Sequence, residues 1–281
     1  LDSLNLGSFD TGNVTKMNAM FSGCENLDTL YIGSFNTENV IKMNGMFTGC
    51  KKLTALNFNN FDTRKVEDMN TMFSDCQGLT SLDLTTFNTE NVTKMSGMFS
   101  GCENLTSISY DPDMFATDNV TDMSSMFSGC QKLDTIDVSK FNTENVTKMS
   151  SMFSECQALT TIYVGDNWNT ENVEKSEDMF HNCLALVGQD GTTYDEESTD
   201  KTKAHYDEGG YLTYKPLFLR GDANGDGEIG MPDVMFIVNY ILGTPAESFN
   251  IKAADANLDG EVGMPDVMYI VNYILNGKFP E

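Results

Sequence analysis

Apolar residues recur through the first two thirds of the chain in a block that repeats about every 26 residues. Each block runs from an aromatic residue through Val, Met, Met-Phe and Cys to two Leu positions. Its cysteine occurs seven times, at intervals of 26, 26, 26, 28, 26 and 27 residues, as Cys24, Cys50, Cys76, Cys102, Cys130, Cys156 and Cys183. Self-similarity at such a period predicts a solenoid in which each repeat packs on its neighbours.

Two elements are expected within each repeat. Apolar and polar residues alternate over 27–32 and its equivalents, which predicts a half-buried strand. Val40, Met43, Met46 and Phe47 lie at offsets of three, six and seven, which places them on one face of a short helix, with Thr37 as its N-cap. These segments are poor in strong helix formers, so some are expected to be 3₁₀ turns. Parallel strands stacked at about 4.8 Å give a solenoid roughly 35 Å long.

The cysteine column and the Met-x-x-Met-Phe segments are both interpreted as core. A free cysteine behaves as a small buried hydrophobic residue, and the flanking columns are apolar. A disulfide stack, a metal ladder and an exposed methionine stripe are the alternatives. One cysteine per repeat does not form a paired framework, so the core interpretation is favoured.

The outward strand positions are mostly small and polar, and they predict an exposed sheet face. Tyr31 and Tyr163 are the only aromatic residues among them, which disfavours a flat sugar-binding platform. A solvated face with no ligand is as consistent with this pattern as a binding face. The two outward columns are Ser3, Thr29, Ala55, Ser81, Ser107, Thr135 and Thr161, and Asn5, Tyr31, Asn57, Asp83, Ser109, Asp137 and Tyr163.

The chain is strongly acidic, with 17 basic and 42 acidic residues and a net charge of −25. Nucleic acids and anionic membranes require clustered Lys and Arg, so neither is expected as a partner. No run approaches the roughly 18 apolar residues of a membrane helix, and no membrane insertion is expected. Residues 1–6 already fit the repeat, so we expect that the chain begins inside a longer protein.

The repeat pattern ends near residue 187, and two further regions follow. Residues 188–216 are rich in Gly and Tyr and are expected to cap the end of the solenoid core. Residues 217–281 contain two copies of an acidic loop followed by an apolar run. The run 217–220 is apolar rather than rich in Gly and Ser, so the two modules are expected to sit against each other. Alternatively, part of this run meets Phe279 and Pro280 and joins the ends of the second module.

The two acidic loops have the spacing of calcium-binding loops. Ca²⁺ takes six to eight oxygen ligands, and a loop of the EF-hand type supplies them at positions 1, 3, 5, 7, 9 and 12. Gly227 and Gly260 occupy position 6, where such a loop turns sharply, and position 9 is expected to act through water. Two Ca²⁺ ions are therefore predicted, held by Asp222, Asn224, Asp226, the Glu228 carbonyl and Asp233, and by Asp255, Asn257, Asp259, the Glu261 carbonyl and Asp266.

No catalytic residues are predicted. His181 and His205 are the only histidines, and neither lies in a nucleophile or metal motif. Acidic residues are numerous enough for a glycosidase-type carboxylate pair. A repeated surface, however, offers repeated carboxylates rather than one differentiated site, so we expect no enzymatic activity.

The repeat motif Phe-x-Thr-x-x-Val-x-x-Met-x-x-Met-Phe-x-x-Cys-x-x-Leu-x-x-Leu over residues 1–187 resembles the BspA-like leucine-rich repeats of bacterial surface proteins. This resemblance implies a secreted or cell-surface location and an adhesion or protein-binding role. The expected fold is an α/β repeat solenoid of parallel strands and short helices, followed by a small all-α calcium-binding module.

The duplicated loop-helix module at 217–281 resembles a type I dockerin. That resemblance implies a cohesin module of a scaffoldin as partner, in a cellulosome-like assembly of anaerobic bacteria. Its contact positions map onto Met231, Pro232, Met235, Val238, Asn239, Met264, Pro265, Met268, Val271 and Asn272. In the best-known dockerins these positions include Ser-Thr and Lys-Arg, so the cohesin class stays open. The ligand of the repeats is also open, and the alternatives are a carbohydrate-binding accessory module or the C-terminal part of a larger polysaccharide-degrading enzyme.

Overall fold

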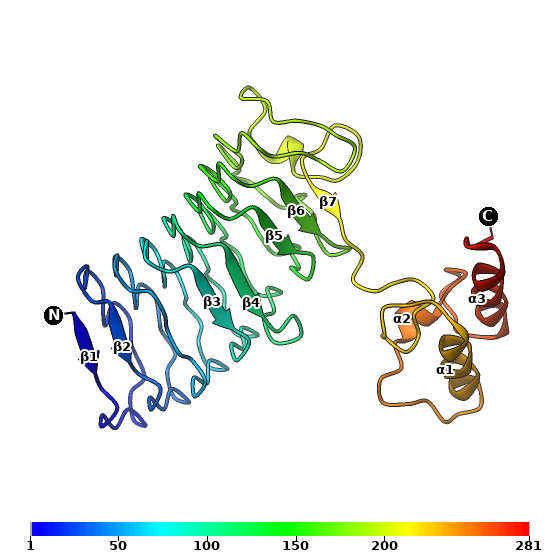
Figure 1. Ribbon diagram of the computed structural model, residues 1–281, viewed down its shortest axis with the longest axis horizontal. Coiled ribbons are helices and arrows are strands. Elements are labelled where there is room, and N and C mark those ends of the chain that lie inside the picture. The colour runs from blue at the N-terminus through cyan, green and yellow to red at the C-terminus, as the bar shows by residue number, and fades with distance from the viewer. Residues whose placement is uncertain (1, 281) are drawn as a thin grey trace. The chain divides into compact units, whose positions relative to one another are not determined.

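The computed structural model describes residues 2–280 (Figure 1). The chain divides into two compact units, Leu1–Lys215 and Pro216–Glu281. Each unit has its own hydrophobic core, so each is considered by itself.

The first unit is a solenoid of parallel strands. Its short strands are β1 (Ser3–Asn5), β2 (Thr29–Tyr31), β3 (Ser81–Leu84), β4 (Ser107–Tyr110), β5 (Thr135–Val138) and β6 (Thr161–Val164). The register follows the repeat, as in the pairing of Ser81 with Ser107 and of Thr135 with Thr161. Successive repeats lie side by side (Figure 1), and their strands form three parallel sheets, β1-β2, β3-β4 and β5-β6 with β7 (Thr213–Tyr214). The predicted parallel-strand solenoid is confirmed.

The repeats differ from the prediction in one respect, because their Met-x-x-Met-Phe segments are turns and not helices within the described residues. The backbone N–H groups of Met43, Gly45 and Phe47 donate to carbonyls of the next repeat, at 3.0, 2.8 and 2.9 Å. A helix would instead direct these groups to residues four positions back. Alternate residues therefore form a second parallel ladder, which includes bridges from Lys16 to Lys42 and onward to Lys175.

The Thr at the start of each turn is also not a helix N-cap. The hydroxyl of Thr37 is buried, donates to Asp62 O at 2.9 Å and accepts from Asp62 N at 2.7 Å. Thr63 and Thr117 make the same pair of bonds to Asn88 and Asn142. This column therefore joins neighbouring repeats.

Stacked apolar columns fill the solenoid core. Phe47, Phe73, Phe99 and Phe127 form part of a continuous ring stack, with centroid distances of 5.5 to 5.8 Å between neighbours. The cysteines from Cys50 to Cys183 are buried and free, as predicted, and Cys24 is partly buried. The thiol of Cys50 donates to Phe21 O at 3.2 Å, and burial raises its pKa to about 12. These thiols are thus neutral core groups.

The C-terminal end of the solenoid core is covered by residues that leave the repeat pattern. This part includes the short helix η1 (Lys201–Lys203) and the strand β7 (Thr213–Tyr214), which pairs in parallel with β6. Tyr211 is fully buried and packs edge-on against Phe180 with 5.5 Å between ring centroids. The indole of Trp168 donates to Ala204 O at 3.1 Å.

The second unit is helical, with α1 (Met231–Ile241), α2 (Ile251–Ala254) and α3 (Met264–Asn276). Val234 and Ile237 of α1 lie in its core, together with their equivalents in α3. Pro232 and Pro265 lie in the first turn of α1 and α3, where proline suits helix geometry. The ends of the unit meet, which agrees with the alternative stated for the run 217–220: the Arg220 guanidinium lies 4.4 Å from the ring centroid of Phe279.

Candidate functional site

The first acidic loop is organised by its own carboxylates. Asp222 Oδ1 accepts from Gly225 N at 2.8 Å and from Asp226 N at 3.1 Å, and Asp222 Oδ2 accepts from Gly227 N at 2.9 Å. Asp233, at the start of α1, accepts from Asn224 N at 3.1 Å and from Gly230 N at 2.8 Å. The first and last acidic residues thus close the loop from both ends.

The second loop repeats most of this arrangement, without a counterpart, among the described residues, of the bond from Gly225 N. Asp255 accepts from Asp259 N at 3.1 Å and from Gly260 N at 3.0 Å. Asp266 accepts from Asn257 N at 3.1 Å and from Gly263 N at 2.8 Å. The two loops therefore share one folded geometry as well as one sequence pattern.

Glycine is required at the turn of each loop. Gly227 has a φ of +88° and Gly260 a φ of +87°, values that L-residues with a side chain rarely adopt. The predicted role of these two glycines is confirmed.

The electrostatics of the first loop favour a cation. Asp233 is almost fully buried, and its pKa is raised by burial and by the nearby negative charges of Asp222 and Asp226. A bound cation offsets such repulsion. The available donors are carboxylate, amide and backbone carbonyl oxygens, which are the ligands that Ca²⁺ prefers.

Between residues 2 and 280, no three His, Cys, Asp or Glu side chains gather closely enough to form a metal cluster by themselves. The carboxylates are instead engaged with backbone N–H groups, and Asn224 Nδ2 donates to Asp226 Oδ2 at 2.8 Å. Glu228 N donates to Asp226 Oδ1 at 2.9 Å, which fixes the position-7 backbone beside the position-5 side chain. The oxygen set therefore fits Ca²⁺ in its chemistry, and Asn and backbone oxygens are needed alongside the carboxylates.

The helices that follow the loops present matching apolar surfaces. Met231 is 56% exposed and Met264 is also 56% exposed, and Met235, Met268, Pro232 and Pro265 are exposed as well. Val238 and Val271 are partly buried against the core of this unit, whereas Asn239 is half-buried and Asn272 is exposed. Ile241, the last residue of α1, is 41% exposed.

Of the two tyrosines predicted on the outward face of the solenoid sheet, one is exposed and the other is covered. Tyr31 is exposed. Tyr163 is half-buried, and Lys215 Nζ lies 5.5 Å from its ring centroid while bonding to Asp137 Oδ2 at 2.5 Å. The structure therefore does not bring the two tyrosines together into one platform.

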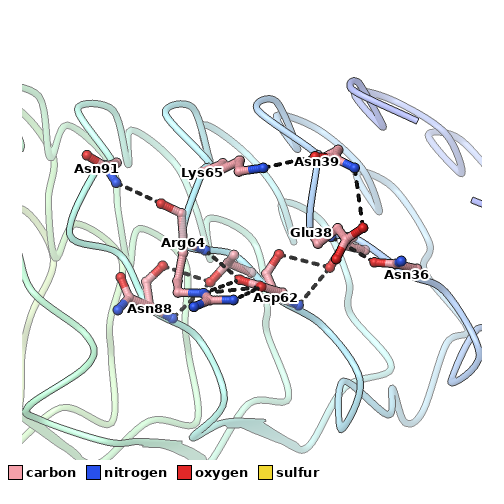
Figure 2. Close-up of polar contacts among 10 residues, drawn as sticks. Asn36, Glu38, Asn39, Asp62, Arg64, Lys65, Asn88 and Asn91 are labelled. Atoms are coloured by element: carbon pink, nitrogen blue, oxygen red, sulfur yellow. Dashed lines mark hydrogen bonds and ion pairs between the residues drawn. The ribbon is translucent and has the colours of Figure 1, made fainter. Parts of the chain in front are cut away.

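One edge of the solenoid carries polar side chains that join repeats (Figure 2). Arg64 Nε donates to Asp62 Oδ1 at 3.0 Å, and this hydrogen bond lowers the pKa of Asp62. Lys65 Nζ donates to Asn39 Oδ1 at 2.9 Å, and Asn91 Nδ2 donates to Arg64 O at 2.7 Å. These side chains bond to one another and to backbone groups of neighbouring repeats, so their role here is structural.

Known families match most of the chain. The family described as "Mycoplasma protein of unknown function, DUF285" matches residues 2–110 and 103–210. The family described as "Dockerin type I domain" matches residues 220–275. The repeat and the dockerin are non-catalytic modules, and type I dockerins are calcium-binding modules. No curated protein sequence matches the chain.

Two solved structures are also similar to parts of the chain. A leucine rich cell surface protein from Faecalibacterium prausnitzii A2-165 is 13% identical, with 82% of this chain and 87% of that chain covered and a TM-score of 0.31. A leucine-rich repeat protein from Bacteroides ovatus ATCC 8483 is 16% identical, with 67% and 70% covered and a TM-score of 0.25. No helix within residues 2–280 is long and apolar enough to cross a membrane.

Proposed function

The chain belongs to the DUF285 family of BspA-like repeat proteins and ends in a type I dockerin domain, and we propose that it is a non-catalytic interaction protein assembled through that dockerin. Dockerins bind cohesin modules. The proposed location is the cell surface or the secreted fraction, where a scaffold protein with cohesin modules holds the chain. The proposed division is a solenoid over 1–187, a cap over 188–216 and the dockerin over 217–281.

The observation that carries this proposal is the duplicated loop followed by a helix. Each loop is proposed to hold one Ca²⁺, through Asp222, Asn224, Asp226, the Glu228 carbonyl and Asp233 in the first loop and through their equivalents in the second. Bound Ca²⁺ supplies positive charge to these carboxylates. The residues themselves hold the loop closed at the start of α1 and α3, so the loop geometry sets where each helix begins.

Two equivalent surfaces are proposed for the cohesin. The exposed pairs Met231 with Met235 and Met264 with Met268 occupy matching places on α1 and α3. An apolar contact of this kind has few ion pairs for salt to screen. Binding is therefore expected to depend weakly on ionic strength.

The test is affinity for a panel of purified type I cohesin modules, measured by calorimetry with Ca²⁺ and with excess chelator. We expect at least one module to bind in Ca²⁺ and to lose binding in chelator. Binding that is equally strong in chelator, or no binding to any module of the panel, would contradict the proposal.

Variants of the binding module separate one surface from two. The pairs Met231→Asp with Met235→Asp and Met264→Asp with Met268→Asp are compared with the fourfold variant and with Met20→Asp, an exposed methionine of the solenoid. Two working surfaces predict that either pair costs little, that the fourfold change abolishes binding and that Met20→Asp has no effect. Loss of binding on changing one pair alone would show a single working surface.

A further inference from the structure

The sheet of the solenoid is interrupted at the third repeat. Within the described chain, residues 55–57 join neither β2 nor β3, although they occupy the strand position of their repeat. The interruption is local. In the turn before β3 the third and fourth repeats are in close contact, since a Cβ added at Gly78 would lie only 2.7 Å from Leu53 O. The two repeats are separated only at the strand position.

A pocket of about 160 Å³ lies at this opening. Its walls come from both repeats, with Leu56 and Phe58 as apolar groups. The polar groups are Asn57, Asn59, Asp83, Thr85 and Thr86. A cavity of about 150 Å³ holds one benzene molecule, so this pocket has room for one six-membered ring.

Hydrogen bonds hold the polar groups of the pocket in place, and several of these groups can form further hydrogen bonds. Asn57 Oδ1 accepts from Asn59 N at 2.9 Å. Asp83 Oδ1 accepts from Thr85 N at 3.0 Å and from Thr85 Oγ1 at 2.7 Å. Asn57 Nδ2, the Asn59 carboxamide and Asp83 Oδ2 make no hydrogen bond to other described residues, so they are available to a ligand. The bonds from Thr85 also lower the pKa of Asp83.

This lining selects a class of ligand. No Lys or Arg lines the pocket, which disfavours an anion. A single carboxylate is too few for Ca²⁺, which needs six to eight oxygen ligands. One carboxylate beside two carboxamides matches adjacent hydroxyl groups, which both donate and accept, and the apolar groups match the C–H face of a ring.

We propose that this pocket, between the third and fourth repeats, binds one neutral pyranose unit of a glycan. The Asp83 carboxylate and the Asn57 amide bind adjacent hydroxyls, and Leu56 contacts the ring. The same column contains Asp137, but its carboxylate is already bonded to Lys215. The proposed site lies in the solenoid alone, so its test and the test of cohesin binding have independent outcomes.

The test is methyl NMR of the full chain with ¹³C-labelled leucine. The probes are methyl β-D-glucopyranoside, methyl β-D-galactopyranoside, methyl α-D-mannopyranoside, cellohexaose and mannohexaose. We expect at least one probe to shift the Leu56 methyl signals and to saturate them in about the millimolar range, while the Leu133 signals stay unchanged. Shifts by a methyl glycoside indicate that a single unit suffices, and shifts by a hexaose alone indicate a unit within a chain.

Two variants assign the site. Asp83→Asn keeps the shape of the side chain and removes its charge, and we expect it to weaken binding about tenfold or more. Asp137→Asn, the same change at an occupied position of the column, is expected to bind as the parent does. If Asp83→Asn does not fold, Asn57→Ala replaces it. The proposal is overturned if no probe shifts Leu56 or if the folded pocket variant binds as tightly as the parent chain.

Discussion

The buried hydroxyl of Thr63 shows how a single side chain holds two repeats together. It donates to Asn88 O at 2.7 Å and accepts from Asn88 N at 2.8 Å, so both polar groups of one backbone residue depend on it. A buried backbone group without a partner is costly. We call this threonine column the polar seam, because its hydrogen bonds join neighbouring repeats within an otherwise apolar core.

Replacement of Thr63 by Val tests that seam. Thr63→Val keeps the shape of the side chain and leaves the N–H and carbonyl of Asn88 without this partner, so the free energy of unfolding should fall by about 1–3 kcal/mol. Denaturant unfolding measures the change, with Thr54→Val at an exposed position as control. A loss no larger than that of the control would show that the seam is not stabilising.

The chemistry of this threonine was visible in the sequence, but its partner was not. A Thr just ahead of an apolar i, i+3 pattern predicts an N-cap in any single repeat. Its actual partner lies 25 residues away, as with Thr37 and Asp62. Such a contact depends on how the repeats stack, which local spacing does not contain.

The repeat is the element that the sequence predicts best. Fixed spacing identifies the strand positions, and alternation identifies which residues face the core. The same i, i+3 spacing that predicted helices in fact marks consecutive turns. Val40 N donates to Thr37 O and Met46 N donates to Met43 O, so the three-residue periodicity arises from turns and not from a helix. Local periodicity alone does not distinguish these two structures.

An irregular repeat accounts for one of the two interruptions of the sheet. The two-residue insertion near Asp111 and Pro112 follows β4, and in the described chain β4 does not pair with β5. Tyr110 OH instead donates to Asp137 O at 2.6 Å across this interval. No insertion in the sequence accompanies the interruption at residues 55–57, so the pocket there could not be predicted from the spacing of the repeats.

The aromatic stack provides the element-scale test. The ring of Phe99 lies between those of Phe73 and Phe127, with centroid distances of 5.8 and 5.5 Å. Phe99→Ala removes a buried ring from the middle of the stack and should cost about 3–5 kcal/mol. Thermal unfolding measures the loss, with Phe9→Ala, whose side chain is 57% exposed, as control. A melting temperature within about one degree of the parent would show that the stack is not the core.

At the scale of the whole molecule, the chain combines a repeat core with a module whose loops concentrate negative charge. The net charge of −25 is partly gathered into two loops that each contain three aspartates. Exposed carboxylates of the solenoid are spread over a large surface, whereas Asp222, Asp226 and Asp233 influence one another directly. Removal of a cation should therefore affect the dockerin and leave the solenoid intact.

The folded geometry of the loops could be predicted from sequence because it is set by local spacing, with glycine at the sixth position of each loop. The partner surface was less predictable, because the module packs Val238 and Val271 partly against its own core. The resemblance to type I dockerins had placed these valines with the exposed methionines among the contact positions. The apolar composition of the run 217–220 left open whether it contacts the solenoid or the end of its own module, and the contact of Arg220 with Phe279 agrees with the second alternative.

Calcium titration of the intact chain tests the central claim most directly. Calorimetry of chelator-treated protein should find two Ca²⁺ ions bound per chain, because each loop contributes one oxygen set. Circular dichroism on the same samples should show that chelation reduces the helical signal of residues 221–275 while the repeats unfold at an unchanged temperature. No bound Ca²⁺, or unchanged helicity in excess chelator, would contradict the account.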